Sequence, residues 1–269
     1  MQYEPIKASL GNVFNKHPQL RVFFYKLLDL LLLRAWHVKK ELKQLRKQIG
    51  EEAACLDGGA GFGQHTYTLS GFSKKWNITS VDIIPEQVED CNRFFSQIGK
   101  GGQVKYIQGD LTKYTNPGVY NLIISIDVME HILDDVAVFR NFSQSLKPGG
   151  VLLISTPSDQ GGSDVHDDHE ESFIAEHVRD GNNIKEIEEK LISSGFSKVE
   201  ARYQYGTPGQ ISWKLSMKYP ITMLNMSKLF FVLLPFYYII TFPISLILNY
   251  FDVIGKHKTG TGLIVKAYK

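Results

Sequence analysis

The chain has 269 residues and a formal net charge of +2, which is enough length for one α/β domain with additions. The charge is uneven, because residues 1–50 carry +7, residues 51–205 carry −11 and residues 206–269 carry +6. An acidic centre with basic ends argues against a general nucleic-acid binder and suits a protein whose ends touch an anionic surface. Two cysteines are too few for a disulfide framework, so we expect reduced thiols and a cytoplasmic location.

The first expected element is a helix over the apolar stretch 20–36, LRVFFYKLLDLLLLRAW. It contains four charged residues, so it is no clean transmembrane span. Its wide apolar face and basic flanks suit the plane of a membrane interface, although packing over another part of the protein explains it equally well. Residues 39–47 read as the solvated end of the same helix. Residues 1–50 together form a basic, amphipathic N-terminal extension.

A glycine turn follows the short apolar run 53–56. Residues 57–63 read DGGAGFG, which predicts a strand, a tight turn and a helix that begins near Gln64. Glycine permits positive φ and close approach of a ligand to the backbone, and the helix start offers unpaired N–H groups. The spacing is not the G-x-G-x-x-G of dinucleotide-binding folds, because the third glycine would fall at position 64.

The next 100 residues alternate strands and helices, which predicts a parallel sheet with helices on both faces. Acidic residues recur where the strands end, at Asp57, Asp82 and Asp110. Ligands bind at the carboxyl ends of such strands, so these three carboxylates are expected to share one crevice. The further expected strands are 77–82, 104–108, 120–126 and 151–155, with helices from Pro85 and over 134–146.

The pattern D-x-G-x-G-x-G at residues 57–63 resembles motif I of the class I S-adenosylmethionine-dependent methyltransferases. The resemblance covers residues 51–205 and the last strand. It implies a doubly wound, seven-stranded, mostly parallel sheet, with S-adenosylmethionine as cofactor and S-adenosylhomocysteine as product. Asp82 would then accept from the ribose, Ile83 would cover adenine and Asp110 would accept from its amino group. The implied cofactor-binding residues are Asp57, Gly58, Gly59, Gly61, Gly63, Asp82, Ile83, Asp110, Leu111 and Ile126.

Candidate catalytic residues follow the fourth strand. Residues 127–131 read DVMEH, and this D-x-x-E-H resembles the E-x-x-E-H stretch of ubiquinone-pathway O-methyltransferases, where these positions are implied in divalent metal binding. A hard metal ion usually wants more oxygens than this set offers, so we do not favour a metal. Removing the proton of a hydroxyl or amine acceptor needs a base, for which His131 with Glu130 is the first choice. The alternative is that these residues only hold the start of a helix.

A second candidate cluster lies in residues 163–171, SDVHDDHEE, in the loop where the family builds its acceptor pocket. His166 and His169 are candidate bases or headgroup contacts. Their spacing is loose for zinc, whose closed sites want four ligands. A solvated acidic loop is the plain alternative.

An apolar insert, residues 206–259, precedes the closing strand at 260–269. Residues 229–251 have no charge and are long enough to cross a bilayer, and lysines flank them on both sides. A single crossing would separate the last two strands, so the insert must leave and return on one side. Pro235 and Pro243 are expected to kink it into a shallow or re-entrant path. A helical lid on the protein itself, or a dimer interface, is the alternative.

The expected function is methyl transfer to a lipophilic or membrane-associated small molecule, at oxygen, by a cytoplasmic protein held at the inner face of a membrane through 20–36 and 211–251. A lipid-linked sugar or polysaccharide precursor is the alternative acceptor, and a non-catalytic cofactor-binding module is the alternative class. Nucleic acid is not expected as a partner, and a homodimer is left open. One scaffold serves many acceptors through its loops, so the sequence alone does not name the acceptor.

Overall fold

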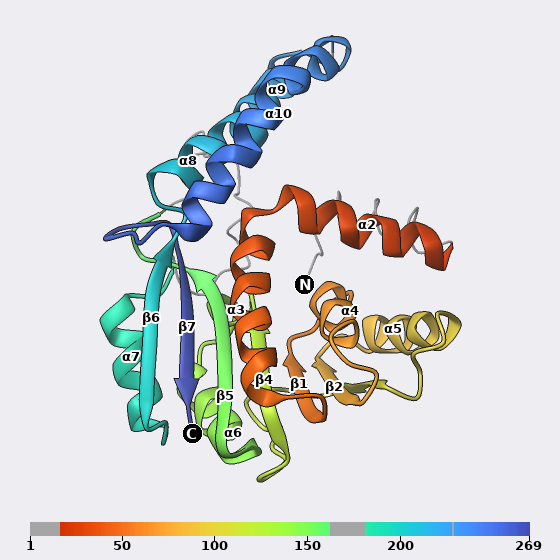
Figure 1. The fold of residues 1–269 in the computed structure, drawn as a ribbon, viewed down its shortest axis with the longest axis vertical. Helices are drawn as coiled ribbons and strands as arrows, with labels where there is room; N and C mark the ends of the chain where they lie inside the picture. Colours follow the sequence, from red (N-terminus) through yellow and green to blue (C-terminus); the bar gives the residue numbers. More distant parts are fainter. Residues whose placement is uncertain (1–16, 162–180, 228) are drawn as a thin grey trace.

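The computed structural model describes residues 17–161, 181–227 and 229–269. At its centre lies a seven-stranded sheet in the order β3-β2-β1-β4-β5-β7-β6, in which β7 runs antiparallel to both of its neighbours (Figure 1). This confirms the expected doubly wound, mostly parallel fold. The strands are β1 (Ala53–Gly58), β2 (Trp76–Asp82), β3 (Val104–Gln108), β4 (Tyr120–Ile126), β5 (Leu146–Pro157), β6 (Lys198–Gln204) and β7 (Gly262–Tyr268).

Helices cover both faces of the sheet because its central strands are apolar on both sides. Successive side chains of a strand point to opposite faces, so Cys55 joins the core on one side and Leu56 the core on the other. The first core is closed by α3 (Leu33–Ile49), α4 (Gln64–Ser70) and α5 (Pro85–Gln97). The second core is closed by α6 (Asp135–Ser145) and α7 (Ile184–Ser193).

The N-terminal extension is two helices, so the expectation of one continuous helix is wrong. The chain breaks at Leu32, which has extended dihedrals of φ −88° and ψ 113°, between α2 (Pro18–Leu31) and α3. The interpretation of residues 39–47 as a solvated helix end is also wrong for one face of α3, which is buried. Val38, Leu42 and Leu45 are fully buried against the sheet, because an amphipathic helix can bury one face while its lysines stay outside.

The apolar insert forms a helical hairpin that projects beyond the carboxyl ends of the parallel strands (Figure 1). The outgoing arm consists of α8 (Thr207–Trp213), the π-helix η2 (Lys214–Lys218) and α9 (Tyr219–Met226), and the returning arm is α10 (Phe230–Ile254). Both arms of the insert therefore meet the core at the same edge of the sheet. The prolines do not reverse its path, however, since α10 continues through Pro235 and Pro243 and the chain turns between α9 and α10 instead. Helix α2 stands at the same edge of the sheet (Figure 1).

Candidate active site

The glycine turn after β1 is held against β2 by its own backbone. The N–H groups of Gly59 and Ala60 donate to the Val81 carbonyl at 2.8 and 3.1 Å. Gly59 has φ +79°, and a Cβ added there would lie 2.4 Å from Cγ2 of Val128. Only glycine fits this position, because both the backbone angle and the space exclude a side chain.

Asp82 ties the turn to the end of the next strand. Its Oδ2 accepts from Gly61 N at 2.7 Å and its Oδ1 accepts from Ile84 N at 3.0 Å, while its backbone carbonyl accepts from Gly109 N at 2.9 Å. The three strand ends that carry Asp57, Asp82 and Asp110 are thus adjacent.

Asp57 lies beneath the turn and is buried. Its Oδ2 accepts a hydrogen bond from Thr66 Oγ1 at 2.6 Å. The same Oγ1 accepts a hydrogen bond from the Tyr106 hydroxyl at 2.9 Å. Burial raises the pKa of Asp57 to about 7, against the opposing effect of the Thr66 hydrogen bond. These contacts join β1 to α4, so Asp57 supports the turn from below.

The other implied cofactor residues surround the turn in different ways. Ile83 is 53% exposed and available to cover a planar ligand, whereas Leu111 and Ile126 are buried. Asp110 is partly exposed, and hydrogen bonds from the hydroxyl and N–H of Thr112 lower its pKa. Asp110 is therefore ionised at neutral pH and able to accept a hydrogen bond from a ligand.

Helix α2 holds the glycine turn from outside, which the sequence did not predict. The buried guanidinium of Arg21 donates from Nη2 to the Phe62 carbonyl at 2.6 Å, and the Tyr25 hydroxyl donates to the same carbonyl. Arg21 also pairs with Asp90 on α5 at 2.5 Å. One feature of the sequence could have pointed to this contact: Arg21 lies within an apolar stretch, and a buried charge needs partners elsewhere in the fold.

A cavity of about 190 Å³ lies beside the first residues of α4. Its wall combines the α2–α3 joint (Leu31, Leu32, Leu33, Arg34 and Ala35) with Gln64, His65, Asp127, Tyr205, Ser212, Trp213, Ser216, Met217 and Asn249. Asp127 and Tyr205, the non-glycine residues with positive φ in the described chain, both have φ +57° and both line it. Strained backbone of this kind clusters at ligand sites.

The polar side of the cavity contains an arginine and a carboxylate. Arg34 forms an ion pair with Asp127, and its backbone N–H donates to the Tyr205 hydroxyl at 3.1 Å. Nε of Arg34 and Oδ1 of Asp127 are buried without a hydrogen-bond partner. Burial lowers the pKa of His65 to about 4, so its imidazole is neutral at pH 7. Buried polar atoms without partners are costly, which favours a polar ligand in this cavity.

The predicted catalytic residues after β4 do not converge. Glu130, on the 3-10 helix η1 (Met129–His131), is buried and accepts from Thr156 Oγ1 at 3.1 Å, whereas His131 is exposed. Asp127 lines the cavity, but neither of the other two does. Across residues 17–161, 181–227 and 229–269, no group of three or more potential metal ligands is found. His166 and His169 lie outside the described residues.

The space over the turn fits S-adenosylmethionine. A Cβ added to Gly61 would meet only Oε1 of Gln87, at 3.7 Å, so a ligand can approach this backbone. That same oxygen is buried and has no hydrogen-bond partner in the described structure. The residues at the turn therefore offer open backbone, an unpaired acceptor, the Asp82 carboxylate and the exposed face of Ile83, which are groups suited to a nucleoside.

Comparison with known proteins supports the same ligand. Residues 49–214 match the sequence family described as a methyltransferase domain. A ubiquinone biosynthesis O-methyltransferase of Rickettsia prowazekii is 29% identical over 103 residues, which are 38% of each chain. The enzyme of the same name from Xanthomonas euvesicatoria is 31% identical over 107 residues, covering 39% of this chain and 43% of that protein. The chain thus spans about two fifths of the length of these curated relatives.

Among solved structures, phosphoethanolamine N-methyltransferase 2 of Haemonchus contortus, in complex with S-adenosylhomocysteine, shares the fold with a TM-score of 0.58 and 19% identity. That match covers 86% of this chain and 52% of the other. The family match covers more than half of this chain, and the sheet order and the glycine turn agree with it. The chain therefore belongs to the class I S-adenosylmethionine-dependent methyltransferases.

Proposed function

We propose that this methyltransferase acts on a lipophilic small molecule bound in the cavity beside α4, and that it methylates an oxygen atom. The observation that carries the proposal is the composition of the cavity wall. Leu31, Trp213 and Met217 supply apolar surface, while Arg34 and Asp127 keep unpaired polar atoms. Small-molecule sites typically combine a mostly apolar wall with a few convergent polar groups.

The polar groups suit a hydroxyl acceptor. When bound, S-adenosylmethionine supplies an electrophilic methyl group, so the protein must orient the acceptor and remove a proton. The Asp127 carboxylate can accept that proton at its unpaired Oδ1, and the neutral His65 imidazole is a second acceptor on the same wall. The acceptor oxygen would then bond to the methyl carbon while the bond from that carbon to sulfur breaks and sulfur keeps the bonding electrons. The role of the exposed His131 as a base stays a prediction, which the His131→Gln variant tests.

A second candidate acceptor is a lipid-linked sugar precursor. Arg34 favours it, because an unpaired guanidinium donor suits the carboxylate or phosphate that such molecules carry. The two candidates differ in the group methylated rather than in their apolar part.

Transfer of a radioactive methyl group tests the proposal. The enzyme is incubated with labelled S-adenosylmethionine and a cell extract, the products are partitioned between organic solvent and water, and the labelled species is identified by mass spectrometry. We expect an O-methylated product in the organic phase that is absent with the Asp127→Asn variant. Label confined to a water-soluble molecule would reject the lipophilic acceptor.

A further inference from the structure

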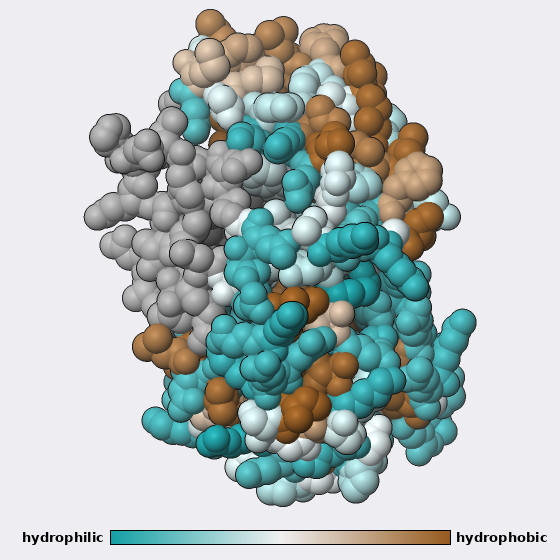
Figure 2. Space-filling view, turned by 90° about the vertical axis from the view of Figure 1, so that its left-hand side faces the viewer, coloured by the Kyte–Doolittle hydropathy of each residue, from teal (hydrophilic) through white to brown (hydrophobic). Residues whose placement is uncertain are grey.

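The hairpin of α8, η2, α9 and α10 presents an apolar surface that the rest of the described protein does not cover. Within the residues that the structure describes, α10 is the one helix long and apolar enough to cross a bilayer, and only 6% of its most apolar window is buried. A core helix of this composition would be mostly covered. Figure 2 shows hydrophobic side chains gathered at the end of the molecule where the hairpin lies.

The exposed side chains of α10 include one continuous stripe. They recur every three or four residues along the whole helix, which places them on a single face. Over 25 residues the stripe is about 38 Å long at 1.5 Å per residue. Its members are Leu233, Phe236, Ile240, Ile244, Ile247, Phe251 and Ile254, and Leu229 extends it just before the helix.

Positive charge accompanies this stripe. From residue 206 to residue 251 the sequence has three lysines and no acidic residue, and the exposed Lys256 and Lys258 follow the end of α10. Anionic lipid headgroups attract lysines of this kind next to an apolar helix, each by about 1 kcal/mol.

Tyrosine side chains hold the two arms of the hairpin together. The hydroxyls of Tyr237 and Tyr238 on α10 donate to the carbonyls of Leu215 and Ser216 at 2.7 and 2.9 Å.

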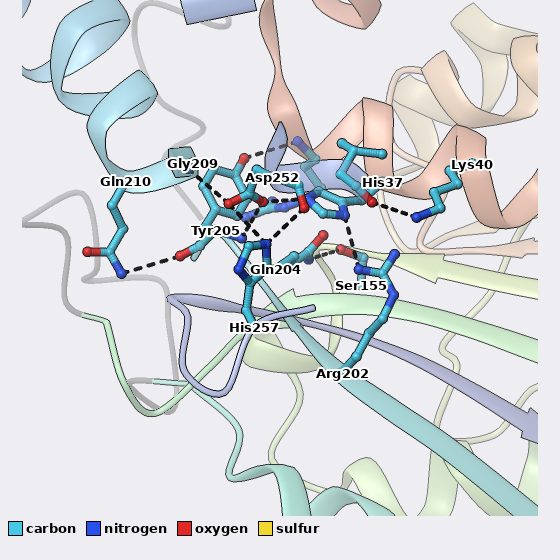
Figure 3. Close-up of polar contacts among 12 residues, drawn as sticks. His37, Lys40, Ser155, Arg202, Gln204, Tyr205, Gly209, Gln210, Asp252 and His257 are labelled. Atoms are coloured by element: carbon cyan, nitrogen blue, oxygen red, sulfur yellow. Dashed lines mark hydrogen bonds and ion pairs between the residues drawn. The ribbon is translucent and has the colours of Figure 1, made fainter. Parts of the chain in front are cut away.

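The base of the hairpin is fixed to the catalytic core. Asp252, near the end of α10, accepts hydrogen bonds from the N–H of Tyr205 after β6 and from the N–H of Gly209 in α8, at 3.1 and 2.9 Å (Figure 3). Lys40 of α3 donates to the Val253 carbonyl at 2.6 Å. A surface anchored in this way keeps a set orientation to the cavity.

We propose that the α10 stripe docks in the interfacial layer of a bilayer that contains anionic lipids, with the helix lying in the membrane plane. The sequence has a lysine at position 228, between α9 and α10, and a lysine is costly deep in hydrocarbon, which favours the interfacial layer over a deep insertion. The exposed Leu20 and Phe23 of α2, at the same edge of the sheet, add a smaller apolar contact.

A lipid surface suits this face better than a second copy of the chain. A two-fold contact brings the same patch of both copies together. Two hairpins rich in lysine and without carboxylates between residues 206 and 251 would repel one another there. A bilayer instead offers the negative charge that the hairpin lacks.

Docking in this orientation also gives a lipid-resident acceptor a route to the cavity, a consequence that rests on the proposed function. The cavity wall is built from the outgoing arm, from Asn249 of α10 and from the α2–α3 joint. Those same elements form the membrane-facing edge of the molecule.

Flotation of the full chain with vesicles tests the docking surface. Vesicles of phosphatidylcholine alone are compared with vesicles of equal parts phosphatidylcholine and phosphatidylglycerol. The variant Ile240→Glu is matched by Ile192→Glu, since both isoleucines lie on helices and are 68% and 49% exposed, but Ile192 is on α7, away from the hairpin. We expect the wild type and Ile192→Glu to float with anionic vesicles, more weakly at high salt. Ile240→Glu should lose about tenfold or more in partitioning, as expected for one fully buried isoleucine.

Three results would overturn the docking surface: a wild type that stays at the bottom of the gradient, an Ile240→Glu variant that floats as well as the wild type, or a lipid-free dimer that Ile240→Glu dissociates. Calorimetry with S-adenosylmethionine serves as the folding control, because Ile240 lies outside the cofactor crevice. Methyl transfer to the extracted acceptor in detergent separates the two proposals. Retained transfer keeps the enzyme assignment, whether or not the protein floats with vesicles.

Discussion

The Nε2 atom of His37 lies 2.8 Å from Oδ1 of Asp252, and both side chains are fully buried (Figure 3). Burial lowers the pKa of His37, so the imidazole is neutral at pH 7 and donates Nε2–H to the carboxylate. Burial opposes ionisation of Asp252, but His37, His257 and the N–H of Gly209 together outweigh it and lower the pKa of this group. Arg202 donates to Nδ1 of His37 at 3.3 Å, which fixes the tautomer. This pair joins the hairpin to the helix that covers the sheet.

Replacing Asp252 with alanine should destabilise the whole enzyme. The change leaves the N–H groups of Tyr205 and Gly209 without their acceptor. A buried donor without a partner costs about 1–3 kcal/mol, so we expect a loss of about 3 kcal/mol in the free energy of unfolding, measured with urea. Asp252→Asn keeps one oxygen acceptor and should lose less. A loss below about 1 kcal/mol for the alanine variant would contradict this role of Asp252.

Replacing Asp82 with alanine should weaken binding of S-adenosylmethionine by tenfold or more. A hydrogen bond to a charged group contributes about 1.5–3 kcal/mol, and the change also frees Gly61 N in the glycine turn. Isothermal titration calorimetry measures the affinity. The control is Asp134→Ala, which removes a carboxylate that caps α6 by accepting from Ala137 N at 3.0 Å. Equal affinities for the wild type and the Asp82 variant would reject the cofactor assignment.

Replacing Arg34 with methionine should weaken binding of the acceptor and leave binding of the cofactor unchanged. The variant removes the ion pair to Asp127 and the unpaired donor in the cavity wall. We expect KM for the identified acceptor to rise about tenfold or more, as for loss of a charged hydrogen bond, with an unchanged Kd for S-adenosylmethionine. Arg46→Met is the matched control, because Arg46 pairs with Glu51 at the far end of α3. An unchanged KM would remove the cavity as the acceptor site.

The Asp57 carboxyl should make stability depend on pH. Its pKa rises from an ordinary 3.8 to about 7, so between these values the native state holds a proton that the unfolded chain releases. This group's contribution to the free energy of unfolding therefore falls as pH rises from about 4 to about 7. His65 acts in the opposite sense, since its pKa falls from 6.5 to about 4.

Comparison of the wild type with Asp57→Asn isolates this effect from that of His65. We expect the stability of the variant relative to the wild type to increase steadily across that pH range, measured by urea unfolding at several pH values. A difference that stays constant with pH would show that the carboxyl does not titrate there.

The sequence by itself determined the sheet and the place of the cofactor turn. Strands β3 and β4 have the bounds that their apolar runs predicted, because turn residues limit each run on both sides. The glycine turn at residues 57–63 could be predicted for the same reason, since its chemistry depends on neighbouring residues and on their spacing. The apolar insert could also be predicted, because residues 229–251 carry no charge, whereas its turn between α9 and α10 could not.

Only the tertiary structure decided how these parts meet. The break at Leu32 turns α2 so that Arg21 and Tyr25 reach the Phe62 carbonyl, and no local pattern marks that break. Asp252 and His37 are 215 positions apart, and Arg34 and Asp127 are distant too. A sequence records spacing along the chain, whereas these contacts depend on how helices pack over the finished sheet. The cavity beside α4 is built from such contacts, which is why Glu130 and His131, the bases expected after β4, do not line it.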